Sequence, residues 1–220
     1  FKVDFEVALL AHLHAQGVGV ATPVLAAKGA ASVTLPFPEG PRALVLFRHC
    51  DGAVPDTPEE LHLTGATLAQ IHSAAQSYAG PASRYVLDGH HLAGRTLGYL
   101  SAHPEIDPAV LDAYRQLIER LLSELADVEG TLTRVMCHGD THGFNNHVTT
   151  DADGVQRAAF FDFDDAGPGF LTYDLCVWLW SNLPRKAPME PDEALLKRWQ
   201  QYLAGYRAGG GHVTDADLAA

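Results

Sequence analysis

The segment Cys137-His138-Gly139-Asp140-Thr141-His142-Gly143-Phe144-Asn145 and the downstream Phe161-Asp162-Phe163-Asp164-Asp165 decide how this sequence is interpreted. Together they gather carboxylates, an amide and two histidines within a short span. The glycines of the first segment interrupt both the 3.6-residue period of a helix and the two-residue period of a strand, which predicts a loop. A loop can direct Asp140 and Asn145 at one point.

Two apolar runs flank these segments. Residues 134–137 precede the predicted loop, and residues 158–161 come just before Asp162. Both runs have the length and composition of short buried strands. We therefore expect strands that hold the loop and deliver Asp162 at a strand end, where rigid scaffolds often carry functional residues.

The residue types fit phosphoryl transfer from ATP. That reaction uses one carboxylate to orient the acceptor hydroxyl and receive its proton, together with oxygen ligands that hold Mg²⁺ against the phosphates. Asp140 can serve as the carboxylate, and Asn145 with Asp162 can serve as the ligands. The sequence thus predicts an ATP- and Mg²⁺-dependent phosphotransferase acting on a hydroxyl group.

The motif His-Gly-Asp-x-His-x-x-Asn, the later Asp-Phe-Asp-Asp, then Gly169 and Tyr173-Asp174-Leu175 resemble the aminoglycoside phosphotransferase and choline kinase superfamily. Residues 39–47 and the run Asp-Phe-Asp-Asp-Ala-Gly-Pro-Gly look most like the branch with the bacterial stress response kinase and homoserine-kinase-like proteins. The resemblance implies an α+β, two-lobed protein-kinase-like fold. Residues 1–50 would form part of an N-terminal lobe with an antiparallel sheet, and residues 51–220 a mainly helical C-terminal lobe.

The resemblance also implies roles for residues that match the family motif. They are Asp140 as catalytic base, His138 as the brace of the catalytic loop, Asn145 and Asp162 as Mg²⁺ ligands, Asp164 as a second metal or substrate contact, and Asp174 as a buried structural acceptor. The acceptor is a small molecule or a protein Ser or Thr, because the catalytic loop treats every hydroxyl alike.

Nucleotide contacts are implied at the other end of the chain. Glu6 lies in the helix that carries the partner of the phosphate-binding lysine. Residues 47–52, which include Phe47 and His49, correspond to the hinge whose backbone binds adenine. Neither Lys2 nor Lys28 is suitably placed to be that lysine. We therefore expect this chain to be a fragment of a longer protein, with the Gly-rich loop and the lysine upstream.

Composition narrows the function classes. The 220 residues carry a net charge of −12, which argues against nucleic-acid binding and suits a cationic acceptor. No apolar run approaches the roughly twenty residues that span a bilayer. The three cysteines form no Cys-x-x-Cys pair, so we expect reduced thiols and a cytoplasmic protein. Cys137, beside His138, is interpreted as a buried strand residue and not as a nucleophile.

Other elements follow from periodicity and capping. Thr57-Pro58-Glu59-Glu60 is a capping box that opens a helix ending near Ala75. The remaining helices are expected at residues 3–16, 92–100, from 108 onward, 172–183 and 193–207, and short strands at 24–27, 32–35 and 43–47. The helix from residue 108 carries leucines at core spacing, and the three tryptophans, Trp178, Trp180 and Trp199, are expected to pack in the interior.

Histidines invite several interpretations. His72, on the apolar side of its helix, is expected to be a hydrogen-bonded core residue. His90, His91 and Arg95 lie in a stretch where relatives carry a substrate-binding insertion, and two interpretations stay open: acceptor contacts or solvated loop residues.

Two other functions compete with the kinase. The string His138-x-Asp140-x-His142, with His147, Asp162 and Asp164 downstream, offers donors for a Zn²⁺ or dinuclear hydrolase site. Asn145 favours Mg²⁺ over Zn²⁺. The second alternative is a nucleotide-binding pseudokinase scaffold, against which the intact Asp140, Asn145 and Asp162 argue.

Overall fold

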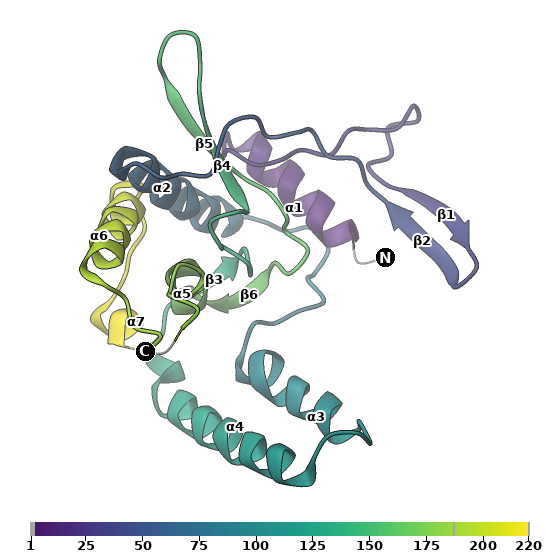
Figure 1. Cartoon of the computed structure of the whole chain (residues 1–220). Helices are drawn as coiled ribbons and strands as arrows, with labels where there is room; N and C mark the ends of the chain where they lie inside the picture. The colour runs from purple at the N-terminus through teal and green to yellow at the C-terminus, as the bar shows by residue number, and fades with distance from the viewer. Residues whose placement is uncertain (1–2, 187, 220) are drawn as a thin grey trace.

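A computed structural model describes residues 3–186 and 188–219 of the chain. In this part of the chain, the strands form three antiparallel pairs: β1 (Val33–Phe37) with β2 (Gly40–Leu44), β3 (Arg134–Cys137) with β6 (Gly167–Phe170), and β4 (Asn146–Thr150) with β5 (Gln156–Phe160). The β1–β2 hairpin projects away from the rest of the molecule (Figure 1).

Strand register brings the two motif segments together. Cys137 at the end of β3 pairs with Gly167 at the start of β6, and Asn146 at the start of β4 pairs with Phe160 at the end of β5. The loop 138–145 therefore joins β3 to β4, while the loop 161–166 joins β5 to β6. Because each loop connects the same two strand pairs, the two loops lie next to each other.

Helices enclose this centre. They are α1 (Val3–Ala15), α2 (Pro58–Ala75), α5 (Leu171–Ser181), α6 (Glu193–Ala208) and the short α7 (Asp215–Ala219). The main core combines the apolar faces of α1, α2, α5 and α6 with two phenylalanines. Phe160 directly precedes the second loop, and Phe163 lies within it. The second loop thus packs directly on the core, which supports its backbone.

The predicted capping box opens α2 as expected. The Thr57 hydroxyl accepts a hydrogen bond from the Glu60 backbone, and the Glu60 carboxylate accepts one from the Thr57 backbone. Each satisfies an amide that the first helical turn would otherwise leave unpaired.

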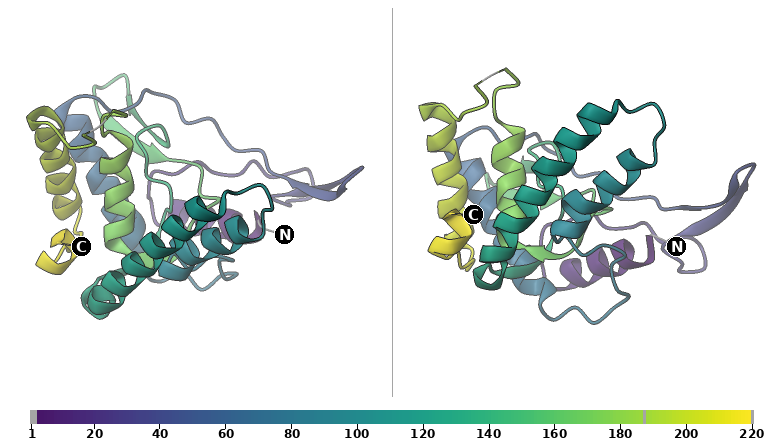
Figure 2. Two further views of the ribbon diagram at one scale, coloured as in Figure 1. Left: turned by 60° about the horizontal axis from the view of Figure 1, so that its bottom comes forward. Right: turned by 90° about the horizontal axis from the view of Figure 1, so that it is seen from below.

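A second helical unit extends from the body of the molecule. A π-helical turn (His90–Gly94) continues into α3 (Arg95–Ser101), which packs against α4 (Pro108–Val128), and a short 3₁₀ turn (Glu129–Thr131) follows α4. Figure 2 shows α3 and α4 side by side in both views. The expectation that α4 forms core is wrong: among its residues only Ile118 is buried, and Leu117 and Leu121 are more than 40% exposed. The apolar residues of α4 face α3 and the π-helical turn that leads into it. A helix in the core would be covered by neighbours on several sides.

The N-terminal strand predictions are partly wrong. Residues 24–27 form no strand; a turn closed by the Gly29 N–H donating to the Ala26 carbonyl reverses the chain there. The strand predicted at 43–47 lies earlier, as β2, because the Glu39–Gly40 turn sets the hairpin register. The α+β class with small antiparallel sheets is confirmed. None of the helices in the described residues has the length and apolarity that crossing a membrane requires.

Candidate active site

The buried carboxylate of Asp174, on α5, anchors the start of the loop 138–145. Its two oxygens accept hydrogen bonds from the backbone N–H groups of His138 (2.7 Å) and Gly139 (2.9 Å). The oxygen that accepts from His138 also contacts His72 Nε2 at 2.9 Å, and Tyr206 holds the other ring nitrogen of His72. The predicted structural role of Asp174 and the core position of His72 are therefore confirmed. The network ties the loop to α2, α5 and α6 at once.

His138 links the two loops. Its Nε2 lies 3.0 Å from the Phe161 carbonyl, and its Nδ1 lies 3.2 Å from the Asp140 backbone nitrogen. Burial lowers the pKa of His138, which favours the neutral ring. A neutral ring can donate from Nε2 and accept at Nδ1, which is the pattern that these two contacts require. The ring therefore braces Asp140 against the second loop.

Asp140 and Asn145 meet across the loop. The Asn145 amide donates to the Asp140 carbonyl (3.0 Å) and to its Oδ2 (3.1 Å), while Asn145 itself is only 5% exposed. His142 Nε2 lies 3.4 Å from the same carboxylate oxygen. Asp140 keeps a partly exposed side chain, so its carboxylate is held in place yet open to a ligand.

Asp162 completes a group of carboxylates on the second loop. It has a φ of 67°, a left-handed conformation that non-glycine residues adopt rarely and often at functional sites. Burial, Asp164 and then Asp140 raise the pKa of Asp162, and burial, Asp164 and Asp140 likewise raise that of Asp165. The four carboxylates of this group therefore repel one another, and a bound cation would stabilise them. They belong to Asp140, Asp162, Asp164 and Asp165.

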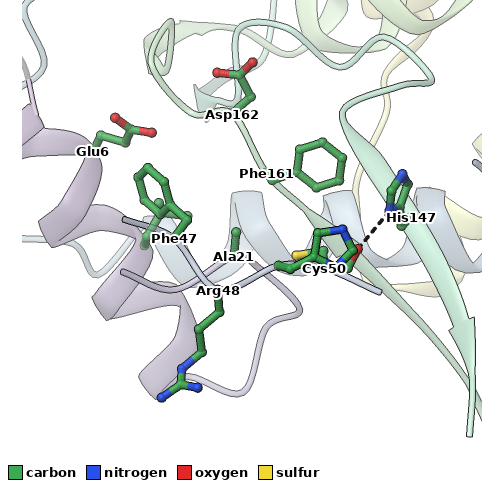
Figure 3. Close-up of a pocket in the computed structure, with 10 residues that line it drawn as sticks. Glu6, Ala21, Phe47, Arg48, Cys50, His147, Phe161 and Asp162 are labelled. Carbon is green, nitrogen blue, oxygen red and sulfur yellow. Dashed lines mark hydrogen bonds between the residues drawn. The ribbon is translucent and has the colours of Figure 1, made fainter. Parts of the chain in front are cut away.

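Glu6 of α1 faces the same carboxylates. Burial, followed by the charges of Asp164 and Asp162, raises the pKa of Glu6 to about 7. Figure 3 shows the Glu6 side chain on the Asp162 side of the cavity. The helix brings Glu6 beside the second loop, while Lys2 lies outside the described residues.

A cavity of about 470 Å³ opens beside Asp162 and Glu6. Its lining comes from α1, from the hinge residues 47–50 and from residues 161 and 162 just after β5, and includes Phe47, His49 and Phe161. The His49 side chain is 81% exposed, so only its backbone can line a buried ligand. Within the described residues, the backbone N–H groups of His49 and Cys50 donate to no other backbone group.

Sequence reasoning missed the part that His147 plays in this wall. His147 of β4 lines the cavity and its Nδ1 lies 2.9 Å from the Cys50 carbonyl, which fixes the hinge against β4 (Figure 3). The sequence offered His147 only as a metal donor. His147 follows Asn146 at the start of β4, and this closeness to the motif loop was the signal in the sequence that could have placed it near the site.

A second cavity, of about 360 Å³, is lined by Asp140. Tyr173, Cys176, Val177 and Trp180 of α5 form the rest of its lining. Trp180 is 54% exposed, so its expected interior packing is wrong. The buried face of α5 carries Leu171, Asp174, Leu175 and Trp178, and a residue two positions after Trp178 points to the other side of a helix.

The other two tryptophans pack on the core: Trp178 is buried, and Trp199 is partly buried. Trp178 stacks on Tyr202 (centroids 4.8 Å apart) and on Trp199 (5.8 Å). Cys137 is also buried, and burial raises the pKa of its thiol well above the ordinary value. It is therefore no nucleophile at neutral pH.

The geometry does not favour the metallohydrolase. Both ring nitrogens of His138 are engaged by the Phe161 carbonyl and the Asp140 amide, so neither is available to a metal. Within the described residues, no three His, Cys, Asp or Glu side chains converge on a common metal position.

Gly139 gives a test of the loop geometry. Its φ is +89°, and a Cβ there would meet the backbone of Asp165 on the neighbouring loop. We expect Gly139→Ala to lower the free energy of unfolding by about 1–2 kcal/mol or more. Gly143→Ala is the matched control, because a Cβ at that position would meet no atom within 4 Å and its φ is ordinary. Urea denaturation of both variants measures the difference; equal stabilities would contradict this account of the loop contact.

These features define a class of protein. A buried carboxylate and a histidine hold a loop that presents an aspartate and an asparagine beside further aspartates, between two cavities. The chain belongs to the phosphotransferase enzyme family, whose sequence model matches residues 2–212.

Individual relatives refine this placement. An uncharacterized protein of Deinococcus radiodurans is 35% identical over 220 residues, covering 100% of this chain and 62% of that protein. A homoserine kinase of Neisseria meningitidis is 31% identical over 210 residues, covering 93% of this chain and 62% of the kinase. The structure of a microcompartment-associated aminopropanol kinase superposes with a TM-score of 0.69 at 26% identity, covering 98% of this chain and 67% of that chain. This chain therefore spans under two thirds of the length of the two sequence relatives.

Proposed function

We propose that the protein transfers the γ-phosphoryl group of ATP to a hydroxyl group of a small molecule. One observation carries this proposal: Asp162 lines the first cavity, Asp140 lines the second, and the two lie on adjacent loops. A nucleotide in the first cavity and an acceptor in the second would meet at these carboxylates. The homoserine kinase and the aminopropanol kinase are both kinases by name, which supports the same reaction class.

The first cavity suits a nucleotide. Phe47, Leu10 and Ala21 supply apolar surface for a base. The N–H groups of His49 and Cys50, which donate to no backbone group of the described residues, can donate to its edge. Glu6 lines that cavity together with Asp162, where it would hold a lysine that binds the phosphates. We also propose residues 1–50 as part of the N-terminal lobe and residues 51–220 as the C-terminal lobe.

The carboxylate group fits a divalent cation. Asn145 uses its Nδ2 to bind Asp140, and within the described residues its Oδ1 accepts no hydrogen bond and is left for a metal. Asp162 adds a carboxylate whose repulsion by Asp164 a cation would relieve. We propose Asn145 and Asp162 as Mg²⁺ ligands and Asp164 as a further contact. When bound, Mg²⁺ would neutralise charge on the phosphate oxygens.

Asp140 is proposed as the catalytic base. Its carboxylate accepts the proton of the acceptor hydroxyl while the hydroxyl oxygen bonds to the γ-phosphorus, and the bond from that phosphorus to the bridging oxygen of ADP breaks. Asn145 and His138 keep Asp140 oriented during this step through the hydrogen bonds described above. The held geometry removes the need to order these groups at the moment of reaction.

Calorimetry with MgATP tests the proposal. On the full-length gene product we expect MgATP binding that Asp162→Ala abolishes, since the variant loses a charged metal ligand. Asp153→Ala, an exposed aspartate of the β4–β5 turn, is the matched control and should bind normally. Unchanged binding by Asp162→Ala would remove Asp162 from the metal site. Binding without any acceptor-dependent ADP release would instead favour the pseudokinase scaffold.

A further inference from the structure

Three basic side chains surround one buried tyrosine beside the active site. The Arg84 guanidinium carbon lies 4.4 Å and that of Arg95 5.3 Å from the centroid of the Tyr85 ring. The His91 ring packs edge-on against the same ring, with centroids 4.7 Å apart. This cluster is notable in a chain whose net charge is −12.

Asp88 and Asp165 lie near the cluster, but within the described residues neither arginine of the cluster forms an ion pair. Most other arginines of the described chain do. The pKa of His91 reflects the positive charge of the cluster. Burial and then the charge of Arg95 lower the pKa, while the charges of Asp165 and Asp88 act in the opposite direction. Like charges held together favour the binding of an anion.

The cluster adjoins the catalytic loop. Ser83, which precedes Arg84, donates its hydroxyl to the Ala166 carbonyl at the end of the second loop (2.7 Å). Tyr85 belongs to a small apolar cluster with Leu87 and Cys137, against which Tyr173 packs. Tyr173 also lines the second cavity together with Asp140. The basic cluster therefore lies on the same side of the catalytic loop as the proposed acceptor cavity.

We propose that Arg84 and Arg95 form a binding site for a carboxylate group of the acceptor, whose hydroxyl then lies at Asp140. A guanidinium stacked on an aromatic ring keeps its N–H edge free, and that edge matches a carboxylate with two parallel hydrogen bonds. The substrate class is thus a small hydroxy acid or hydroxy amino acid. The overall acidity of the chain by itself suits a cationic acceptor, whereas these two arginines favour an anionic group. The inference rests on the proposed phosphotransferase function.

Matched acceptors test the carboxylate. We would compare homoserine with 3-aminopropan-1-ol, and glycerate with ethylene glycol, in an ADP-release assay on the full-length gene product. Each pair shares a hydroxyl chain and differs by one carboxylate. We expect kcat/KM to be at least about 10-fold higher for the carboxylate member of a pair. Higher kcat/KM for the decarboxylated members would overturn the proposal while leaving the phosphotransferase function intact.

Variants test the two arginines. Arg84→Gln combined with Arg95→Gln should raise KM for the carboxylate acceptor about 10- to 100-fold, leave kcat nearly unchanged and leave KM for the decarboxylated acceptor unchanged. Arg120→Gln on α4, an exposed arginine paired with Glu124, is the control and should behave like the wild type. A KM shift of equal size for both members of a pair, or no shift at all, would exclude the site.

Direct binding separates failure of the inference from failure of the function. Calorimetry would measure homoserine and glycerate binding to the enzyme saturated with the Mg²⁺ complex of a non-hydrolysable ATP analogue. Binding that is weakened in the double variant supports the carboxylate site, and no binding of either probe overturns it. Loss of MgATP binding itself would instead contradict the proposed function. Thermal unfolding of the double variant should match the wild type, because both arginines are exposed.

Discussion

Asp140→Asn is expected to lower kcat by about 10²- to 10⁴-fold, the range typical for loss of a general base. The amide has nearly the same size as the carboxylate but cannot accept the acceptor's proton. MgATP affinity should stay close to that of the wild type, because Asp140 lines the second cavity and not the first. The variant should therefore separate binding from chemistry.

Steady-state ADP release and MgATP calorimetry on the same preparation measure both quantities. Asp153→Asn serves as the control, since it makes the same chemical change on the exposed β4–β5 turn. Turnover by Asp140→Asn within a few-fold of the wild type would remove Asp140 from the role of base. A parallel loss of MgATP binding would indicate that Asp140 acts through the metal site.

Asp174→Ala should produce the largest loss of stability, about 3–5 kcal/mol in the free energy of unfolding. The change leaves the backbone N–H groups of His138 and Gly139 without their acceptor and removes the partner of His72, all in the interior. Buried donors without partners cost the full desolvation of those groups. We also expect kcat to fall, because these hydrogen bonds fix the start of the catalytic loop.

Urea denaturation gives the stability change, and Asp112→Ala gives the baseline. Asp112 lies on the exposed face of α4, where its contacts with Arg115 and Gln116 are solvated, so its loss should change stability by no more than about 0.5 kcal/mol. A similar small effect for Asp174→Ala would show that the loop is held by other contacts. His72→Gln should fall between the two variants if the network acts as a unit.

Local sequence predicts secondary structure well where the interactions that stabilise an element involve residues close together in the chain. The strand 134–137 and the helix opened by Thr57 lie where the sequence predicts them, because the strand pattern and the capping box involve neighbouring residues. The loop nature of 138–145 follows in the same way from its glycines. The predicted grouping of Asp140, Asn145 and Asp162 depends on the family motif as well.

Predictions that depend on distant partners are less reliable. The apolar spacing of α4 indicates core, yet burial depends on how many elements pack against a helix, and α4 has few neighbours. Trp180 is expected inside because tryptophan is large and apolar, whereas the face of α5 that carries it borders the second cavity. Neither outcome is encoded in the residues next to these positions.

The sequence by itself determined the type of most elements, the loop that carries Asp140 and the chemistry that its side chains can perform. These depend on periodicity, capping and residue type, which act over a few positions of the chain. The family resemblance implied a buried Asp174, but only the tertiary structure decided that its carboxylate accepts from the backbone N–H groups of His138 and Gly139 and contacts His72. It also decided that Arg84, His91 and Arg95 gather around Tyr85 beside that loop. These arrangements arise from strand pairing and helix packing between segments far apart in sequence, so no local pattern records them.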